Sequence, residues 1–475
     1  MRSQSSRASG IRRRFQAAAI SAAVSFSGSC ALHRPRSADT PPIPLPDAFA
    51  HAAGERTLAE RWWEEIGDPA LNELMSEALR GSFDLARAQA RLEQAEAVAS
   101  AAGADRRPQL TLEAGARRAR TIGAAGPQAG QAVEANTFSL GLAAAYELDL
   151  WGRVGATARA ARREAEASRD DVATARLSLA AELADAWLQA REQAEQLALL
   201  ETQRRAGRDY VELTERRFAE GQATALDVLQ QRQQNAALGA LAPPIEARYA
   251  VLRHQLAVLA GRAPGDAPAP PRGLPELPPL PAAGVPADLL ARRPDVRAAM
   301  ARLAAADERI AAAVAARLPA LRFSASAGYQ AGEVSALFDE WIGNLIGNLA
   351  LPLLDGGRRA AEVRRARAAL REQAAAAAQT LLRAMREVED ALVQEERQRE
   401  TARRLETQAR LAAETLAQAR EQHVNGLSDY LSVLTAVDRL QAIERSLVAA
   451  RRQAWTYRLQ PVSYTHLTLP TIYSV

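Results

Sequence analysis

A change of hydrophobic period that occurs twice limits what this chain can fold into. Residues 137–150 alternate apolar with polar or small side chains, as in a strand with one apolar face, and a helical pattern begins at Arg153. Residues 146–153, at this change, read Tyr-Glu-Leu-Asp-Leu-Trp-Gly-Arg, and residues 353–358, Leu-Leu-Asp-Gly-Gly-Arg, form a second copy. We therefore expect two places where a strand passes directly into a long helix.

The first helical pattern runs from about Arg153 to Phe218 without a proline and is rich in alanine. At ~1.5 Å per residue such a helix would be roughly 100 Å long, far longer than globular domains use. It turns at residues 220–224, and an antiparallel partner is expected from about Ala225 to Leu241. Apolar spacings near 3.5 residues predict packing along neighbouring helices.

The second half of the chain repeats the first. Gly152 and Gly357 are separated by the same number of residues as Gly221 and Gly426, which stand at two predicted helical turns. The proline-rich segment between the halves predicts a linker without helix or central strand. The expected order is a first structural repeat at residues 68–262, the linker at 263–286 and a second repeat at 287–460.

Each repeat is expected to contain a first helix, a β-hairpin and a helical hairpin. Asp68 followed by Pro69 predicts a helix start, and that helix should run to about Gly103. A strand with Leu110 and Leu112 on one face should give way after Glu113 to a loop rich in Gly, Ala and Gln. The β-hairpins are expected at about residues 108–150 and 319–354, and the helical hairpins at about 153–241 and 357–460.

The N-terminus has the order of a secretory signal. Arginines 12–14 precede an apolar run that ends in small residues before Cys30, so residues 1–29 are expected to be a signal peptide. Cys30 is the only cysteine, which excludes an internal disulfide and suggests lipidation, although Ser27 stands where lipoproteins usually carry Leu. Residues 30–67 would then be a lipid-anchored extended arm; the alternative is an unmodified thiol.

Composition and motifs argue against nucleic acid and catalysis. The chain has no lysine, and its 60 arginines face 56 acidic residues, a net charge of +4 in which both signs alternate along helices. No nucleophile elbow, phosphate loop or dinucleotide fingerprint is present, so we expect no enzyme and no cofactor. No metal site is expected either, because the histidines lack metal-ligand spacing; they are His33, His51, His254, His423 and His466.

Four amphipathic strands of about ten residues each have the length needed to cross a bilayer. Four strands cannot close a barrel, and an open edge in lipid would leave backbone groups unpaired. Three copies of the chain would supply twelve strands, an even number within the usual range. A soluble antiparallel sheet flanked by coiled coil is the alternative, but the signal and Cys30 favour a membrane channel.

The chain resembles TolC-like outer membrane factors, specifically the NodT-type lipoprotein branch of resistance-nodulation-division (RND) efflux systems. The resemblance covers nearly all of residues 40–460. It rests on motifs at residues 62–63 (Trp-Trp), 68–71 (Asp-Pro-Ala-Leu), 90–92 (Ala-Arg-Leu), 146–153, 293–296 (Arg-Pro-Asp-Val) and 353–358.

This resemblance implies a mainly helical protein with β-structure, in which three chains form a twelve-stranded outer-membrane β-barrel continuous with a long periplasmic α-helical barrel. It implies a Gram-negative outer membrane location, contact with membrane lipid, a periplasmic adaptor (membrane fusion) protein and an inner-membrane RND pump as partners, and export of small molecules such as drugs and toxic compounds. Two alternatives stay open: a channel for type I protein secretion and a periplasmic coiled-coil scaffold.

Three sets of residues are candidate functional positions. In the family the helical turns meet the adaptor and close the resting pore, which points here to Gly221, Thr224, Asp227, Gly426, Ser428 and Asp429. The strand-to-helix transition is expected to lie where the membrane barrel gives way to the periplasmic tube, with Gly152 and Gly357 allowing a bend and charged neighbours in a wet wall: Asp149, Arg153, Asp355 and Arg358.

The pore constriction departs from the family pattern. Relatives commonly carry Asp where this chain has Thr435, and Arg where it has Asp438. Since Asp438 is one helical turn further along the same face, three copies would still form an acidic ring. At the C-terminus, residues 461–475 leave the helical pattern and resemble a translated sequencing adapter, so a non-native tail is expected there.

Overall fold

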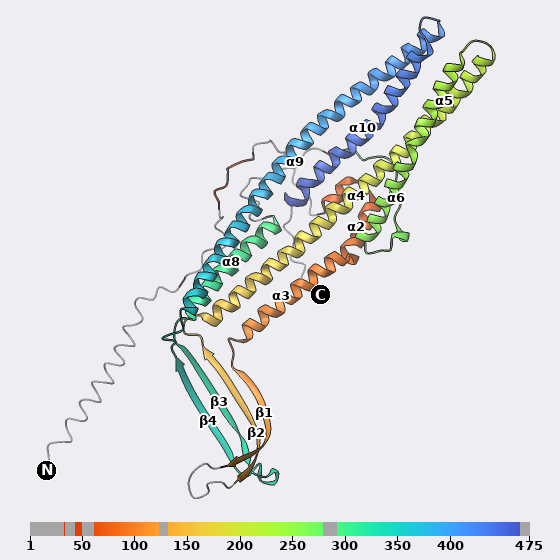
Figure 1. The fold of residues 1–475 in the computed structure, drawn as a ribbon. Coiled ribbons are helices and arrows are strands. Elements are labelled where there is room, and N and C mark those ends of the chain that lie inside the picture. The colour runs from red at the N-terminus through yellow and green to blue at the C-terminus, as the bar shows by residue number, and fades with distance from the viewer. Residues whose placement is uncertain (1–32, 34–42, 50–60, 123–131, 279–291, 466–475) are drawn as a thin grey trace, which may run out of the picture. The chain divides into compact units, whose positions relative to one another are not determined.

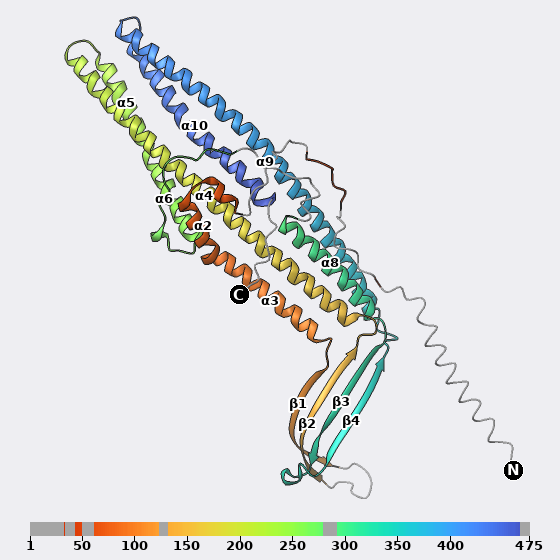
Figure 2. The ribbon, with the colours of Figure 1, turned by 180° about the vertical axis from the view of Figure 1, so that it is seen from behind.

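The computed structural model of the 475-residue chain describes residues 33, 43–49, 61–122, 132–278 and 292–465. The chain divides into two compact units, which we call the sheet unit and the helical unit (Figures 1 and 2). Of the described residues, the sheet unit comprises 33, 96–122, 132–164 and 303–373, and the helical unit comprises 43–49, 61–95, 165–278, 292–302 and 374–465.

Four antiparallel strands form one sheet in the order β1-β2-β3-β4 (Figure 1). They are β1 (Gln109–Ile122), β2 (Ala132–Leu148), β3 (Ala320–Ala331) and β4 (Trp341–Ala350). β1 and β2 form one hairpin, β3 and β4 form another, and β2 pairs with β3 to join them. Within the described part of the chain, β1 and β4 each pair with one strand only, so the sheet has two open edges.

β1 is longer than the sequence pattern predicts. The residues after Glu113, which were expected in a loop, continue the strand, with Ala114 opposite Leu140 and Ile122 opposite Ala132. Local composition there shows little hydrophobic alternation. The strand forms because its backbone N–H and C=O groups pair with β2, a long-range interaction that a local pattern does not report.

In both halves of the chain, helical residues precede the β-hairpin and a long helix follows it. Two helices of 67 residues, α4 and α9, follow the two hairpins, and each turns back into a shorter helix. Both views show α4 beside α5 and α9 beside α10 near these turns (Figures 1 and 2). The helices are α2 (Pro69–Gly81), α3 (Phe83–Ala104), α4 (Arg153–Ala219), α5 (Ala225–Ala240), α6 (Ala242–Leu259), α8 (Pro294–Ala315), α9 (Arg358–Val424) and α10 (Tyr430–Thr465), with 3-10 turns η2 (Trp62–Ile66), η3 (Pro264–Asp266) and η4 (Val334–Ala336).

The single helix expected from Asp68 to Gly103 is wrong, because it is broken at Ser82. Ser82 has extended backbone angles (φ −66°, ψ 125°) and separates α2 from α3. A close backbone approach accompanies the break: a Cβ added to Gly261, whose φ is +77°, would lie 2.2 Å from the carbonyl oxygen of Gly81. Only glycine permits that approach, and Gly81 is also a poor helix former.

The core of the helical unit is built around tryptophans. Trp62 and Trp63 are buried and meet edge to face with ring centroids 5.7 Å apart. They pack with apolar residues of α2, α4, α6 and α10, including Leu71, Trp187 and Trp455. The Trp pair therefore packs the start of α2.

Two predictions differ from the structure, one about the end of α10 and one about the linker. α10 continues to Thr465 instead of ending at Gln460, although Pro461 has no N–H to donate within the helix. The linker contains a short 3-10 turn, η3, where neither helix nor strand was expected. The rest of the expected C-terminal tail, residues 466–475, lies outside the described residues.

Candidate functional site

One face of the sheet carries aliphatic and aromatic side chains in continuous rows across the strands, and we call it the apolar face. Its exposed members include Trp341 (72% exposed) and Leu345 (79%), although such side chains are usually buried. From the helical end outward, the rows are Leu148, Leu321 and Leu349; Tyr146, Phe323 and Gly347; Leu110, Ala144, Ala325 and Leu345; Leu112, Leu142, Ala327 and Gly343; Ala114, Leu140, Tyr329 and Trp341; and Ala116, Phe138 and Ala331.

The opposite face, which we call the polar face, is formed by the alternate residues of the same strands. Glu147 stands there opposite Arg322, which stands opposite Asn348. The Nε of Arg322 donates to Oε2 of Glu147 at 3.0 Å, and Asn344 Nδ2 lies 3.4 Å from Ser326 Oγ. The sheet thus separates an apolar surface from one that carries hydrogen-bonding side chains, although Ile342 and Ile346 of β4 also lie on the polar face.

Both strand-to-helix transitions use an aspartate that caps the following helix. Asp149 accepts from the backbone N–H of Val154 at 3.0 Å and of Gly155 at 2.7 Å, at the start of α4. Asp355 accepts in the same way from Gly357 at 2.9 Å and Arg359 at 3.1 Å, at the start of α9. These donors lower the pKa of the Asp355 carboxyl. Capping compensates helix N–H groups that have no partner in the helix.

Glycines and arginines complete the two transitions. Gly152 has φ +73° and Gly357 has φ +84°, a backbone region that favours glycine. Arg153 donates to Glu147 from Nε and Nη2, at 3.0 and 2.7 Å, which ties the end of β2 to the start of α4. The backbone N–H of Arg358 donates to the Asp355 carbonyl at 3.2 Å. The placement of these residues at a membrane boundary remains a prediction.

The predicted turn residues form two compact helix-to-helix connections, the first turn (residues 220–224) and the second turn (residues 425–429). Gly221 and Gly426 have φ +75° and +73°, and each N–H donates back into the last turn of the preceding helix. In the first turn, Thr224 and Asp227 form a reciprocal capping box: the Asp227 N–H donates to Thr224 Oγ1 at 3.2 Å, and the Thr224 N–H donates to Asp227 Oδ2 at 2.8 Å.

In the second turn Asp429 plays the capping role. Its Oδ1 accepts from the N–H of Ser432 at 3.1 Å, while the carbonyl oxygen of Ser428 lies 3.2 Å from Nδ1 of His423. Large apolar side chains are exposed around both turns: Phe218, Leu226, Leu229, Val424, Leu427 and Leu431. We call these six residues the apolar tip residues.

Sequence reasoning missed the residues that connect the two helical hairpins. His423 lies 2.8 Å from Arg217 of α4, and Tyr430 donates to Gln231 of α5 at 2.7 Å. Burial raises the pKa of Tyr430. No sequence signal identifies these pairs, because the partners are about two hundred residues apart in the chain.

The two candidate constriction residues differ in environment. Thr435 is exposed, and its hydroxyl donates to the carbonyl of Leu431 at 2.8 Å within α10. Asp438 is half-buried and accepts from Gln234 of α5. Burial raises the pKa of Asp438, while Arg445 opposes this shift. The acidic ring remains a prediction that a single chain does not test.

The described part of the linker, residues 263–278, lies against the helices, and we call it the strap. Its many prolines leave carbonyl groups that no helix or strand satisfies. Side chains of α4, α9 and α10 donate to them: Arg191 Nε to Gly273 (2.6 Å), Trp455 Nε1 to Pro275 (3.0 Å), Arg399 Nη2 to Pro278 (2.6 Å) and Arg458 Nη1 to Pro278 (3.0 Å).

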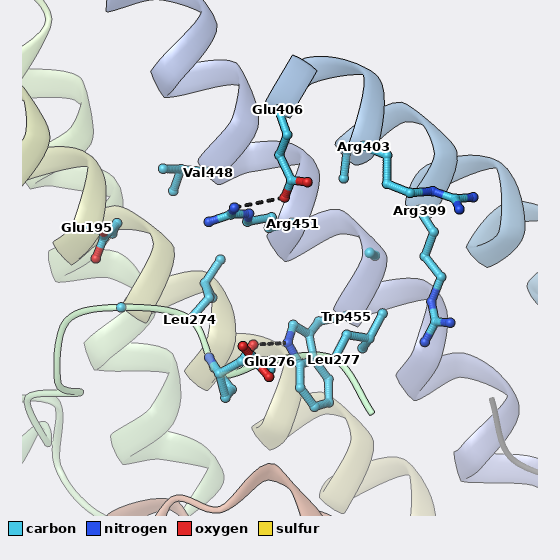
Figure 3. Close-up of a pocket in the computed structure, with 14 residues that line it drawn as sticks. Glu195, Leu274, Glu276, Leu277, Arg399, Arg403, Glu406, Val448, Arg451 and Trp455 are labelled. Atoms are coloured by element: carbon cyan, nitrogen blue, oxygen red, sulfur yellow. Dashed lines mark hydrogen bonds and ion pairs between the residues drawn. The ribbon is translucent and has the colours of Figure 1, made fainter. Parts of the chain in front are cut away.

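A cleft of about 670 Å³ opens beside the strap (Figure 3). Strap residues Leu274 and Leu277 line one side, and arginines of α9 and α10 line another. Arg451 pairs with Glu406 at 2.8 Å, so the cleft contains compensated charge. Its position indicates a structural junction between helices and strap.

The remaining predictions concern lipidation and metals. Cys30 lies outside the described residues. Within the part of the chain that the structure describes, no group of three or more His, Cys, Asp or Glu side chains is arranged to hold a metal ion. No helix among those residues is both long enough and apolar enough to cross a bilayer.

Comparison with known proteins decides the family. The sequence model of outer membrane efflux proteins matches residues 74–261 and 285–460. The chain belongs to the outer membrane efflux protein family. The predicted resemblance to TolC-like outer membrane factors is thereby confirmed, and so is the outer membrane location.

Relatives of this outer membrane efflux protein match most of its length. The pyoverdine export outer membrane protein OpmQ of Pseudomonas putida is 35% identical over 338 residues, which cover 70% of this chain and 72% of OpmQ. Outer membrane protein OprJ of Pseudomonas aeruginosa is 32% identical over 424 residues, 84% of this chain and 85% of OprJ. The structure of the outer-membrane channel OprN is similar with a TM-score of 0.82 and 27% identity, covering 90% of this chain and 99% of OprN.

Proposed function

We propose that three copies of this chain form the outer-membrane channel of a tripartite efflux system. The observation that carries the proposal is the sheet, which has one exposed apolar face and two open edges. In lipid the unpaired backbone groups of β1 and β4 would be costly. Pairing β1 of one copy with β4 of the next removes both edges and closes a twelve-stranded barrel.

The height of the apolar face agrees with this arrangement. Its rows run from Leu148 to Phe138 on β2. The ten residue-to-residue steps from Phe138 to Leu148, at ~3.3 Å each, span roughly 33 Å. A tilt of about 40°, usual for outer-membrane barrels, reduces the height to roughly 25 Å, the height of their apolar band. In this proposal the polar face lines the lumen.

The helical unit would supply the periplasmic part. Helices α4 and α9 are far too long for an ordinary globular core, and helices of three copies would pack side by side into a tube. The apolar tip residues would meet the periplasmic adaptor, because exposed apolar patches mark protein contacts. The six turn residues named from the sequence hold these tips in shape. An inner-membrane RND pump would complete the assembly.

Small molecules are the proposed cargo. OpmQ is named for pyoverdine export, and the match to it covers about seven tenths of both chains. Transport needs no covalent step, and no enzyme activity is proposed. Lipidation at Cys30 would add a membrane anchor beside the barrel.

The constriction proposal has its own test. If three Asp438 carboxylates form a ring, Asp438→Ala should reduce the cation selectivity of the closed pore in planar bilayers. Thr435→Ala is the matched control, since it removes an exposed hydroxyl from the same helix. Unchanged selectivity in the Asp438 variant would exclude the ring.

The channel itself is tested with the purified full chain. Native mass spectrometry in detergent should give three times the chain mass, and planar bilayers should show discrete ion conductance. A monomer without conductance would favour the scaffold alternative. Cells lacking this chain should accumulate a fluorescent pump substrate; unchanged dye efflux with retention of a secreted protein would favour type I secretion instead.

A further inference from the structure

At the hairpin tip, the rows of the apolar face end in charged and polar residues. Beyond the row of Ala116 and Phe138, the next two rows on the same face pair Arg118 with Asn136 and Arg120 with Glu134. Both arginines are largely exposed, at 71% and 66% of their side chains. Charged side chains thus replace apolar ones within a single step along the strand.

These charges belong to one local cluster. Arg118 Nη2 lies 2.5 Å from Oε2 of Glu134, and Arg120 Nη1 lies 4.0 Å from Oε1 of the same carboxylate. Two guanidinium groups share one carboxylate, so the cluster carries a net charge of +1 in each chain. An exposed ion pair of this kind contributes at most about 1 kcal/mol to stability, so stability alone gives little reason for the second arginine.

The position of the cluster identifies its surroundings, and here the inference rests on the proposed function. An aromatic group marks the end of the apolar rows: Tyr329 lies opposite Trp341 and meets Phe338 at 5.2 Å between ring centroids. Such aromatic residues lie at membrane interfaces. Arg118 lies on β1, two residues beyond Ala116, which pairs with Phe138. This places it about 5 Å further along the membrane normal, within the headgroup layer.

The position of the cluster in the sheet also determines which leaflet of the membrane it faces. The cluster lies at the hairpin end of the sheet, whereas α4 and α9 start at the other end. Since the helices extend into the periplasm in the proposed channel, the cluster faces the outer leaflet. At the helical end, the last row of the same face is entirely leucine: Leu148, Leu321 and Leu349.

We propose that Arg118 and Arg120 form a binding site for the phosphate groups of an outer-leaflet lipid headgroup. A guanidinium presents a planar pair of N–H donors that matches a phosphate, and its charge complements the anion. The strand register places the two arginines in neighbouring rows, and Glu134 pairs with both and so competes with a phosphate for them. In a trimer three such sites would surround the barrel and fasten its outer rim to the leaflet.

The test measures lipid retention by the full chain. Purified protein is exchanged into micelles containing lipopolysaccharide, enzymatically dephosphorylated lipopolysaccharide or phosphatidylcholine, and retained lipid is counted by native mass spectrometry. The wild-type protein should retain the phosphorylated lipid, and the double variant Arg118→Ala, Arg120→Ala should retain at least tenfold less, because each arginine near an anionic surface contributes about 1 kcal/mol.

Arg117→Ala is the matched control, because Arg117 is adjacent in sequence but lies on the polar face opposite Thr137. It should leave retention unchanged. Glu134→Gln should increase retention, since it removes the competing carboxylate; this variant keeps both arginines and guards against a folding defect. Equal retention by the wild type and the double variant, or equal retention of dephosphorylated lipid, would overturn the site.

Trimer mass and conductance are measured on the same samples. A conducting trimer without phosphate selectivity would refute the headgroup site and leave the channel intact. A wild-type protein that forms no trimer and conducts no ions would refute both the headgroup site and the proposed channel.

Discussion

Nη1 of Arg217, near the end of α4, lies 2.8 Å from Nε2 of His423, near the end of α9. Nδ1 of the same imidazole lies 3.2 Å from the carbonyl oxygen of Ser428. Because the arginine can only donate and the carbonyl can only accept, these contacts assign the proton to Nδ1 of a neutral ring. His423 thus connects the second turn with the first helical hairpin.

Removing this contact should loosen both turns. Arg217→Ala is expected to cost about 0.5–1.5 kcal/mol locally, the usual net value of one hydrogen bond, so amide exchange at residues 218–224 and 425–429 should accelerate roughly two- to twelvefold. Arg216→Ala is the control, because Arg216 pairs with Glu212 on its own exposed helix surface. Equal exchange rates in the two variants would show that the contact does not couple the hairpins.

Asp438 predicts a pH-dependent stability. Burial raises its folded-state pKa, so its protonated form is favoured in the native helix, and stability decreases as pH rises from the ordinary Asp value, about 3.9, through the raised value. Asp438→Asn keeps an acceptor for Gln234 without the charge. At pH 7 this variant should unfold at a higher denaturant concentration than the wild type. Its gain in the free energy of unfolding should be less than about 1.4 kcal/mol, because the side chain is partly exposed.

The gain from Asp438→Asn should shrink as pH falls through the raised pKa, when the wild-type carboxyl becomes neutral. Asp209→Asn, at an exposed position of α4, should show no such pH-dependent gain. Denaturant unfolding of the full chain at pH 4 and pH 7 measures both effects. A constant difference between wild type and Asp438→Asn at both pH values would contradict the burial argument.

Asp68 supports both the start of α2 and the strap. It is 5% exposed and accepts hydrogen bonds from Trp187 Nε1 at 2.8 Å and Arg191 Nη1 at 2.5 Å. Arg191 also donates to the carbonyl oxygen of Gly273 in the strap. Asp68→Ala should cost about 3–5 kcal/mol, because it leaves a largely buried arginine without its counter-charge. Chemical denaturation measures the loss. Asp84→Ala, which removes an exposed carboxylate near the start of α3, should cost far less; equal losses would contradict a special role for Asp68.

Periodicity made the long elements predictable from sequence. The alternation from Phe138 to Leu148 and the proline-free stretch after Arg153 each report local structure over many residues, so β2 and α4 begin or end close to the predicted positions. The turn glycines Gly221 and Gly426 were equally visible, because positive φ strongly favours one residue type.

Long-range contacts were not predictable in the same way. The break at Ser82 accompanies the approach of Gly261 to Gly81, and the outer half of β1 depends on pairing with β2. The link between Arg217 and His423 joins residues 206 positions apart. In each case the deciding partner is distant in sequence, and a local pattern carries no record of it.

The pairing of β2 with β3 depends on two glycines placed directly opposite each other. A Cβ added to Gly328 would lie 2.6 Å from both Cα of Gly141 and the carbonyl oxygen of Leu140, closer than real Cβ contacts allow. Because both obstructing atoms belong to the backbone of β2, Gly328→Ala would force the strands apart, at a cost of about 1–3 kcal/mol. The joint between the two hairpins should weaken, and the unfolding temperature of the protein in detergent, followed by circular dichroism, should fall.

Gly332→Ala is the control, since its Cβ would meet only the Asn136 carbonyl oxygen at 3.8 Å, an ordinary contact. If the two variants unfold at the same temperature, the close approach of β2 and β3 is not required for a stable sheet.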